Sequence, residues 1–459
     1  MTNNIVTVNV TQTVAPSPST LQETGALISQ GATNTAVGTM SLLTQLSDLT
    51  PLLNAPAAIT SLTWLASVVT ATTTAPHGLP TGQTIELTIA GATPSAYNGT
   101  VACTITGAST FTYPLVSDPG AETVPGTWVT IGRAELTAMA TTFFAQGSQQ
   151  AVYVLELGPG DPAHGVTELT TLIGASPQFF YSYLVPRGWA DESTFITMLA
   201  SYEALDKKTY FFVTVIQGNY TSFTALMKCA FCLIEAPSIP ATEFSCAAPF
   251  FVSLHYRPSS TNKVTPFAFS YLFGVTRYPT VGNSSLLATL KAAFINWVGT
   301  GAEGGISNAC LFWGTTKDGN DFTYWYSVDW VQINGDEDIA NAVINGSNNP
   351  QNPLYYNQDG INRLQAVAVN LLTSGISFGL VLGDIVQTQL DSSPFQQALD
   401  SGKYAGKTVI NAVPFINYSK ANPGDYSIGR YAGLTVAYVP ARGFTQIVFN
   451  INVSNFVAV

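Results

Sequence analysis

The chain has 459 residues, enough for about three domains, and only 9% of them are charged, against a usual share of about 25%. Lysine and arginine number 16, and aspartate and glutamate 27, so the net charge is −11. Because cations are so few, extended binding to nucleic acid and attachment to a membrane through a basic surface are both disfavoured. With 46% hydrophobic residues and so few charges, much of the surface is expected to be covered by partners or by copies of the chain.

The N-terminus predicts neither a leader nor an anchor. Its first residues, MTNNIVTVNVTQ, contain no basic segment and no continuous apolar stretch. Elsewhere polar residues, glycine or proline interrupt every apolar run, and the longest candidate, 376–386, is shorter than the about 18 residues that span a bilayer. We therefore expect no stable membrane insertion and a cytosolic chain, unless an assembly carries it outside the cell.

Residues 6–11 alternate apolar and polar side chains, which predicts a strand, and Pro16 and Pro18 follow as an extended hinge. The other end of the chain shows the same alternation. The apolar positions of the two segments are Val6, Val8, Val10, Ile447, Phe449, Ile451 and Val453. Terminal residues usually fray unless they are paired, so we expect each arm to pair either within its own fold or with a neighbour by strand addition.

Between residues 59 and 132 the composition changes to threonine, alanine, glycine and proline. Short alternating runs such as 84–89 are separated by turn signals, including Asn98-Gly99 and Asp118-Pro119-Gly120. Short strands at this spacing predict a small all-β module. Because helical patterns resume at Arg133, we interpret the module as an insertion into a larger domain.

From Arg133 onward, helical and strand patterns alternate. Helices are predicted around 136–143, 166–173 and 195–202, and nearly continuous apolar strands at 151–157, 179–185 and 210–216. This alternation favours an α/β domain with a mostly parallel sheet. A further amphipathic helix is predicted from Leu287 through Trp297, ending at Gly299.

A β-hairpin is predicted over 311–330, with its turn at 317–321 and an aromatic second strand at 322–330. A helix over about 360–373 then opens a C-terminal unit. The predicted fold class is α/β, mixed α+β overall: an α/β core domain with an inserted small all-β module, a C-terminal α+β domain and β-strand terminal arms. The predicted boundaries are 1–20 for the N-terminal arm, 21–58 plus 133–345 for the core, 59–132 for the insertion and 346–459 for the C-terminal domain.

Residue types that carry chemistry form no catalytic pattern. His77, His164 and His255 lack neighbours at metal-ligand spacing, and the loop 158–165 fails the spacing of a dinucleotide fingerprint. The chain contains neither a P-loop nor a nucleophile elbow. We therefore predict no catalytic residue, no metal, no cofactor and no enzymatic activity.

Two further groups of reactive side chains favour structural interpretations. The acidic clusters 318–321 and 336–338 are interpreted as a hairpin turn and as the N-terminus of a helix. Cysteines are five, an odd number that does not resemble a disulfide framework: Cys103, Cys229, Cys232, Cys246 and Cys310. Although Cys229 and Cys232 have redox-motif spacing, they lie in an apolar stretch, so reduced and buried thiols are expected.

Several segments together carry a resemblance to a known family. They are 24–31 (TGALISQG), 152–157 (VYVLEL), 308–330, 345–365 and the β-forming tail from Gly443. Over nearly its whole length the chain resembles the tail sheath proteins of bacteriophages with contractile tails. The module that contains 76–82 and 92–99 also looks like a small β insertion of several phage structural proteins.

The resemblance implies a non-enzymatic virion protein, assembled in the cytoplasm of a host bacterium. Such subunits polymerise as stacked hexameric rings around a tail tube and contract to drive the tube through the host envelope. Their partners would be further copies of the chain, the tail tube protein, and baseplate and tail terminator or neck proteins. The arms would add strands to neighbouring sheets, the C-terminal unit would face the tube, with Arg363 as the candidate tube-facing residue, and the insertion would project outward.

Two other classes stay open. A baseplate or tail-tube structural protein would share the composition, although tube proteins are generally shorter and richer in β-structure. A glycan-binding tail adhesin would use exposed aromatic residues within 324–330 or the inserted module as a sugar platform, but an amphipathic aromatic strand is more often part of a core.

Overall fold

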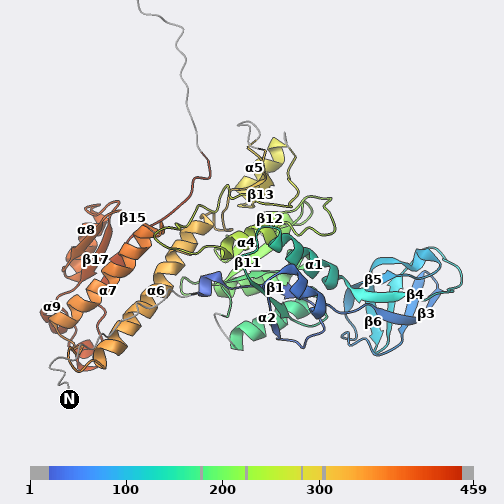
Figure 1. The fold of residues 1–459 in the computed structure, drawn as a ribbon, viewed down its shortest axis with the longest axis horizontal. Helices are drawn as coiled ribbons and strands as arrows, with labels where there is room; N and C mark the ends of the chain where they lie inside the picture. The colour runs from blue at the N-terminus through green and yellow to red at the C-terminus, as the bar shows by residue number, and fades with distance from the viewer. Residues whose placement is uncertain (1–19, 176–178, 223–225, 281–282, 302–306, 447–459) are drawn as a thin grey trace, which may run out of the picture. The chain divides into compact units, whose positions relative to one another are not determined.

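A computed structural model describes residues 20–175, 179–222, 226–280, 283–301 and 307–446 of the protein (Figure 1). These residues form two compact units. The larger contains Leu21–Pro258 and Asn262–Tyr326, and the smaller contains Ser327–Pro440. The two predicted strand-forming arms, with all seven of their apolar positions, lie outside the described residues.

The larger unit is built on a six-stranded sheet with the order β12-β11-β10-β1-β9-β2. Its strands are β1 (Gly25–Ser29), β2 (Met40–Leu43), β9 (Val152–Glu156), β10 (Ser182–Leu184), β11 (Tyr210–Val215) and β12 (Ala230–Ile234). All neighbouring pairs are parallel except β2, which runs antiparallel to β9 at one edge. The predicted mostly parallel sheet is therefore confirmed.

Helices cover both faces of this sheet, so its central strands are apolar on both sides. The helices of the unit are α1 (Ile131–Phe144), α2 (Pro162–Ala175), α3 (Ser193–Leu199), α4 (Ala247–Leu254) and α5 (Ser284–Ala292). Two consecutive residues of β11 show the two faces, because Phe211 packs on Phe195 of α3 at 5.8 Å and Phe212 packs on Phe250 of α4 at 5.3 Å. Short 3-10 turns occur at Leu21–Glu23, Leu46–Leu52, Ser95–Tyr97, Arg187–Trp189, Ala200–Tyr202 and Tyr220–Ser222.

The predicted all-β insertion is a closed six-stranded barrel with the order β3-β4-β7-β6-β5-β8. Its strands are β3 (Ala57–Leu65), β4 (Val68–Thr73), β5 (Thr84–Ala90), β6 (Gly99–Gly107), β7 (Thr110–Pro114) and β8 (Thr127–Thr130). Alternate residues such as Leu87, Ile105 and Phe111 fill the interior, and threonines dominate the outer face. Residues 57–130 contain no lysine or arginine, so the barrel surface has no cation with which to attract an anionic partner.

The predicted hairpin over 311–330 is wrong. Its first strand exists as β14 (Cys310–Phe312), but this strand pairs with β13 (Trp297–Gly299). Residues 322–330 are instead the first turns of the long helix α6 (Phe322–Ser347). The buried aromatics Phe322, Tyr326 and Trp330 recur every four residues, which is helical spacing, although the dense aromatic content suggested a strand.

Two smaller expectations fail for related reasons. The acidic residues 336–338 lie in the middle of α6 and not at a helix N-terminus. The helix that was predicted to reach Gly299 ends as α5 at Ala292, and Trp297–Gly299 pairs as β13. The first error follows from the wrong hairpin, because α6 begins already at Phe322. The second arises because the helical pattern continues past Ala292, whereas Trp297–Gly299 pairs with β14.

The smaller unit contains most of α6, together with the predicted helix α7 (Gln358–Ser377) and a three-stranded sheet of order β16-β17-β18. Its other elements are β15 (Val381–Leu382), β16 (Ile385–Thr388), α8 (Ser392–Asp400), β17 (Thr408–Ala412), α9 (Phe415–Ala421), α10 (Pro423–Ser427), β18 (Leu434–Ala437) and β19 (Val439–Pro440). The central strand β17 is fully buried, whereas β16 and β18 are partly exposed.

The predicted fold class is confirmed in its main features: a mixed α/β protein with a parallel-rich sheet, an inserted barrel, and further small sheets and helices. Among the described helices, none is both long and apolar enough to cross a bilayer.

Phe212 tests the aromatic core on the α4 side of the sheet. Its ring is fully buried and lies 4.9 Å from Phe231 and 5.8 Å from Phe322. Replacing Phe212 with alanine should lower the free energy of unfolding by about 3–5 kcal/mol, because a cavity would replace these contacts. Ile216, next to the end of β11 and 44% exposed, is the matched control, and its change to alanine should cost less than about 1 kcal/mol. Equal losses in urea unfolding would contradict this packing.

Candidate functional site

The sequence-predicted arm residues cannot be placed, since all of them fall outside the described residues. The predicted tube-facing residue, Arg363, lies on α7. Its Nη1 donates hydrogen bonds to the carbonyl oxygens of Asn352 at 3.3 Å and Pro353 at 3.2 Å. Arg363 thus holds the loop that precedes its own helix, and its contact with a tube stays a prediction.

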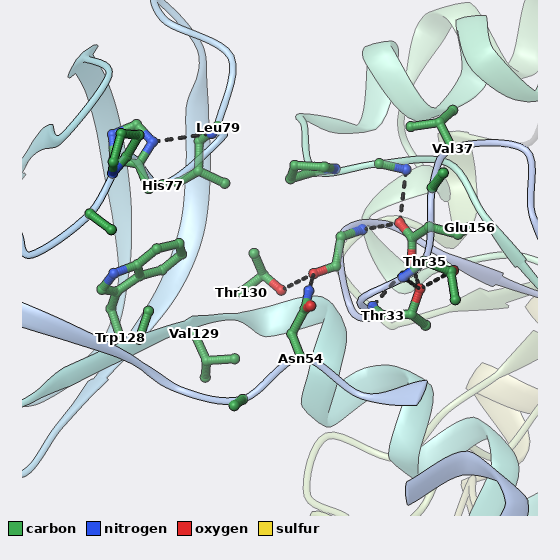
Figure 2. A pocket seen from close by; sticks show the side chains of 18 of the residues that line it. Thr33, Thr35, Val37, Asn54, His77, Leu79, Trp128, Val129, Thr130 and Glu156 are labelled. Carbon is green, nitrogen blue, oxygen red and sulfur yellow. Dashed lines mark hydrogen bonds between the residues drawn. The ribbon is translucent and has the colours of Figure 1, made fainter. Parts of the chain in front are cut away.

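The junction between the barrel and the sheet is organised by Glu156, the last residue of β9, which is 1% exposed. Its Oε2 accepts hydrogen bonds from the hydroxyls of Ser29 at 2.6 Å and Thr33 at 2.7 Å, and from the backbone N–H of Thr33 at 3.1 Å. Its Oε1 accepts from the N–H groups of Gly31 at 2.7 Å and Gly158 at 2.8 Å (Figure 2). These donors compensate for the burial of the carboxylate.

The two segments that connect the sheet to the barrel both donate a hydrogen bond to the carbonyl oxygen of Gly31. Asn54, just before β3, donates to it through Nδ2 at 2.9 Å, and Thr130, the last residue of β8, donates through Oγ1 at 2.8 Å. Gly31 has φ +66°, and a Cβ there would lie 2.6 Å from the Cβ of Pro159. A glycine is therefore needed where the loop, the barrel connections and the Pro159 loop converge.

A cavity of about 450 Å³ lies beside this junction. Its barrel side carries His77, Leu79 and Trp128, and its sheet side carries Thr33 and Glu156 (Figure 2). The His77 Nδ1 accepts a hydrogen bond from the N–H of Leu79 at 3.1 Å, and the imidazole packs edge-on against Trp128 at 6.1 Å. With Glu156 committed to five donors, these contacts hold the junction together and supply no acid–base pair.

A second polar centre lies at the carboxyl edge of the parallel strands, where α/β proteins commonly hold ligands. Arg187, just after β10, binds both oxygens of Glu235 through Nε at 2.6 Å and Nη2 at 2.9 Å. The Arg187 N–H donates to Glu135 of α1 at 2.8 Å. Burial raises the pKa of Glu135, against the lowering effect of Arg187. An internal ion pair therefore braces this edge.

The thiols and histidines do not form a reactive group. All five cysteines are free and buried, as predicted, and burial raises the pKa values of Cys103 and Cys232 to about 12, so their nucleophilic thiolates are suppressed. His164 belongs to the first turn of α2, not to a loop as predicted, and His255 ends α4. Among the described residues, no group of three or more His, Cys, Asp or Glu is arranged to hold a metal ion.

The acidic cluster 318–321 performs local turn chemistry. The Asp318 carboxylate accepts hydrogen bonds from the Thr316 hydroxyl at 2.6 Å and from the Trp325 indole N–H at 2.9 Å. Asp321 lies just before α6, where it accepts from the N–H of Thr323 at 3.1 Å and from the N–H of Gly443 at 2.7 Å. The turn prediction holds, but the turn leads into a helix.

Sequence reasoning missed Glu156 and Arg187. The sequence carried one signal for Glu156, an acidic residue within the otherwise apolar strand predicted at 151–157. A carboxylate that is buried in such a strand requires hydrogen-bond donors. No sequence pattern pointed to Arg187, because its partners come from α1 and from the end of β12.

No protein-family model and no curated protein matches the chain. Solved structures do. A chain in the 6-fold symmetrised cryo-EM structure of the anti-feeding prophage (AFP) baseplate aligns with TM-score 0.52 and 13% identity, over 99% of this chain and 100% of that chain. This chain shares the overall fold of that baseplate chain.

Two further matches come from sheaths themselves. A chain of the AFP helical sheath in its contracted state aligns with TM-score 0.49 and 10% identity, over 99% of this chain and 100% of that one. The sheath tail protein Lin1278 from Listeria innocua aligns with TM-score 0.42 and 8% identity, over 94% and 96% of the two chains. At the level of the fold, the match to the AFP baseplate chain confirms the predicted resemblance.

Replacing Glu156 with glutamine tests the junction between the barrel and the sheet. The amide would direct an NH₂ group toward buried N–H or hydroxyl donors, so the free energy of unfolding should fall by about 3 kcal/mol. Glu168 on α2, half-buried and without a hydrogen bond from its side chain within the described residues, is the matched control. Its change to glutamine should cost less than about 0.5 kcal/mol in urea unfolding. A neutral Glu156→Gln change would show that the five donors do not stabilise the fold.

Asp321 gives the stability of the protein a pH dependence. Burial raises the pKa of its carboxyl above the ordinary 3.8, although the N–H groups of Gly443 and Thr323 lower it. The folded chain therefore binds a proton that the unfolded chain releases, so the stability contributed by Asp321 is present at low pH and is lost as the pH rises through the folded pKa.

Urea unfolding from pH 4 to pH 7 should accordingly show wild type losing stability relative to Asp321→Asn as the pH rises. Asp206→Asn, at an exposed position, should follow the wild-type profile. Identical pH profiles for wild type and Asp321→Asn would contradict the prediction.

Proposed function

We propose that the chain is a structural subunit of a contractile tail sheath, which polymerises around a tail tube and contracts to drive the tube through a host envelope. The observation that carries the proposal is the nearly full-length fold likeness to the AFP baseplate chain. At 13% identity the likeness concerns the fold, so assembly, contraction and the tube partner belong to the proposal. Stacked hexamers in a virion tail, with baseplate and tail terminator or neck proteins at the ends, complete it.

The proposed role is non-enzymatic, and the chemistry of the polar centres supports it. Glu156 is saturated by donors and Arg187 is paired with Glu235. Both centres connect elements that are distant in sequence. A subunit that transmits force through a lattice needs such internal bracing, because otherwise load would deform the subunit before it moved its neighbours.

Exposed apolar side chains on the smaller unit support self-association. Those at least 40% exposed are Val343, Ile344, Tyr355, Leu382, Ile416, Tyr426 and Ile428. Scattered apolar residues are normal on a surface, but Ile416, Tyr426 and Ile428 come from α9, α10 and the residue that follows α10. Because the net charge is only −11 over 459 residues, like-charge repulsion between copies opposes the burial of these side chains only weakly.

The C-terminal arm is proposed to link subunits by strand addition. In the smaller unit, β16 and β18 are the edges of a three-stranded sheet, and each is partly exposed. An edge strand offers a row of unpaired backbone groups to an incoming strand. The alternation of Ile447, Phe449, Ile451 and Val453 suits a strand with one apolar face.

A second candidate is a baseplate subunit of the same fold. It is favoured because the AFP chain that aligns with TM-score 0.52 belongs to a baseplate structure. A baseplate subunit would form closed rings that do not stack into long tubes. Electron microscopy of the purified chain separates the two candidates directly.

Deleting residues 1–15 should abolish polymerisation and leave a folded monomer, because the strand-forming part of the N-terminal arm would be lost. Negative-stain electron microscopy of wild type at high concentration should show hollow, ring-stacked tubes, and the truncated chain should show none. Circular dichroism should report the same secondary structure for both.

A matched pair of full-length variants controls for chain length. Changing Val6, Val8 and Val10 to serine should reproduce the deletion, whereas Thr7→Ser with Asn9→Ser should still form tubes. Tubes from the truncated chain would contradict the role of the arm, and isolated rings from wild type would favour the baseplate candidate.

A further inference from the structure

The short sheet of β13 and β14 in the larger unit has one buried face and one partly open face. Isolated bridges extend it on both sides, with Tyr271 opposite a residue of β14 and Tyr278 opposite a residue of β13. Tyr278, Val298 and Leu311 lie on the buried face and are at most 9% exposed. Their neighbours along each strand point the other way. This partly open face, which we call the aromatic face, carries Phe269, Tyr271, Arg277, Trp297, Gly299, Cys310 and Phe312.

The first cross-strand row of the aromatic face is a continuous set of rings. Phe312 packs edge to face with Phe269 at 5.5 Å and stacks on Trp297 at 5.7 Å, with 13° between the ring planes of the stacked pair. Trp313 adds a fourth ring, 5.8 Å from that of Trp297. Phe269 and Trp313 have φ values of +64° and +77°, which bulky side chains rarely adopt. Strained backbone of this kind clusters at binding sites.

The second row has large side chains at its two ends and small residues between them. It runs from Tyr271, which is 53% exposed, across Cys310 and Gly299 to Arg277. Neighbouring strands lie about 4.8 Å apart, so about 14 Å separate the Cα atoms of Tyr271 and Arg277. A Cβ at Gly299 would lie 2.8 Å from Cε2 of Phe312, so the absence of a side chain there lets the Phe312 ring lie over the sheet. The two rows together form a shallow platform with an aromatic floor.

The platform is positively charged in an otherwise acidic protein. Segment 244–302 contains four cations and no acidic residue, whereas the whole chain has a net charge of −11. Lys291 of α5 holds its ammonium 5.2 Å from the ring centre of Trp313. Arg277 is exposed, and its Nη2 donates a hydrogen bond to the carbonyl oxygen of Ser307 at 2.9 Å. Within the described residues neither cation forms an ion pair with a carboxylate, so both charges are available to a ligand.

Exposed aromatic rings beside cations that lack carboxylate partners suit an acidic sugar. The C–H groups of a pyranose ring present an apolar face that packs on aromatic side chains, while the hydroxyls at its rim keep their water. A carboxylate on the same ring pairs with a guanidinium through charge-assisted hydrogen bonds. A wholly apolar partner would instead strip water from Arg277 and Lys291 without replacing it, which is unfavourable. Charge complementarity therefore favours an anionic ligand with apolar ring faces.

We infer that the aromatic face binds an acidic oligosaccharide, one whose pyranose rings carry carboxylates. The sugar rings pack on Phe312 and Tyr271, Arg277 binds a carboxylate, and Lys291 supplies a second positive charge. This binding goes beyond the proposed structural role and does not depend on polymerisation. It also lies on neither of the segments that the sequence offered as a sugar platform, since 324–330 belong to α6 and the inserted module is the barrel.

Isothermal titration calorimetry on the purified full-length chain tests the inference. The probe is α-1,4-linked hexagalacturonate. Two ligands serve as controls: the neutral counterpart, in which each carboxylate is reduced to an alcohol, and a hexaglutamate peptide, which keeps the charges without the sugar rings. Hexagalacturonate should bind about tenfold more tightly than either control, because rings and charges both contribute. Equal affinity for hexaglutamate, or no binding of hexagalacturonate, would overturn the inference.

Variants locate the binding on the aromatic face. Tyr271→Ala should weaken hexagalacturonate binding about fivefold through a lost ring contact, and Arg277→Gln about tenfold through a lost charge-assisted hydrogen bond. Both side chains are exposed, so circular dichroism should show the wild-type spectrum for each variant. Tyr355→Ala and Lys420→Gln, at exposed positions of the smaller unit, are the matched controls and should bind as wild type does. Equal affinities in all five proteins would overturn the inference.

Electron microscopy of the same variants separates a sugar site from an interface between copies. If the aromatic face binds sugar, Tyr271→Ala and Arg277→Gln should leave the assembly state of wild type unchanged, whether tubes, rings or single chains. Loss of tubes in these variants, together with no binding of hexagalacturonate by wild type, would assign the face to a neighbouring copy and overturn the inference. Single chains that bind hexagalacturonate would support the inference and contradict the sheath proposal.

Discussion

The arrangement of the larger unit depends on one buried carboxylate. Glu156 collects hydrogen bonds from the ends of β1 and β9, and it fixes the loop whose Gly31 carbonyl receives both connections of the barrel. A buried carboxylate without donors would be strongly destabilising, so these loops have little freedom to separate. An inserted module held in this way is coupled firmly to its host sheet.

The scarcity of charge shapes the rest of the molecule. Within the described residues the ion pairs are few, and the most buried one, Arg187 with Glu235, acts as an internal brace. Aromatic packing replaces charge as the main source of cohesion: Phe212 alone contacts aromatic rings from β12, α4 and α6. Burial of rings is less specific than ion pairing, so the hydrogen-bonded centres at Glu156 and Arg187 supply the geometric specificity.

The candidate site was predictable only in part. The alternation at both termini predicts strand-forming arms, and these stay a prediction because their apolar positions lie outside the described residues. The long helix α6 was hidden, because residues 322–330 were interpreted as a strand and 336–338 as a helix N-terminus. The partners of Arg187 were hidden as well, because no local pattern shows that α1 and the end of β12 lie together.

The sequence by itself determined the local periodicities: the parallel-sheet strands, the short strands of the insertion predicted at 59–132 and the helix predicted over about 360–373. It also carries the alternation of apolar and polar residues near both ends, which predicts the arms. These follow from the side-chain period of the backbone, which neighbouring residues impose on one another. Only the tertiary structure decided which aromatic run became helix, which edges stayed open, and which distant donors converge on Glu156. Those outcomes depend on contacts between residues more than a hundred positions apart, such as Ser29 with Glu156, and the energy of such contacts leaves no periodic trace in the sequence.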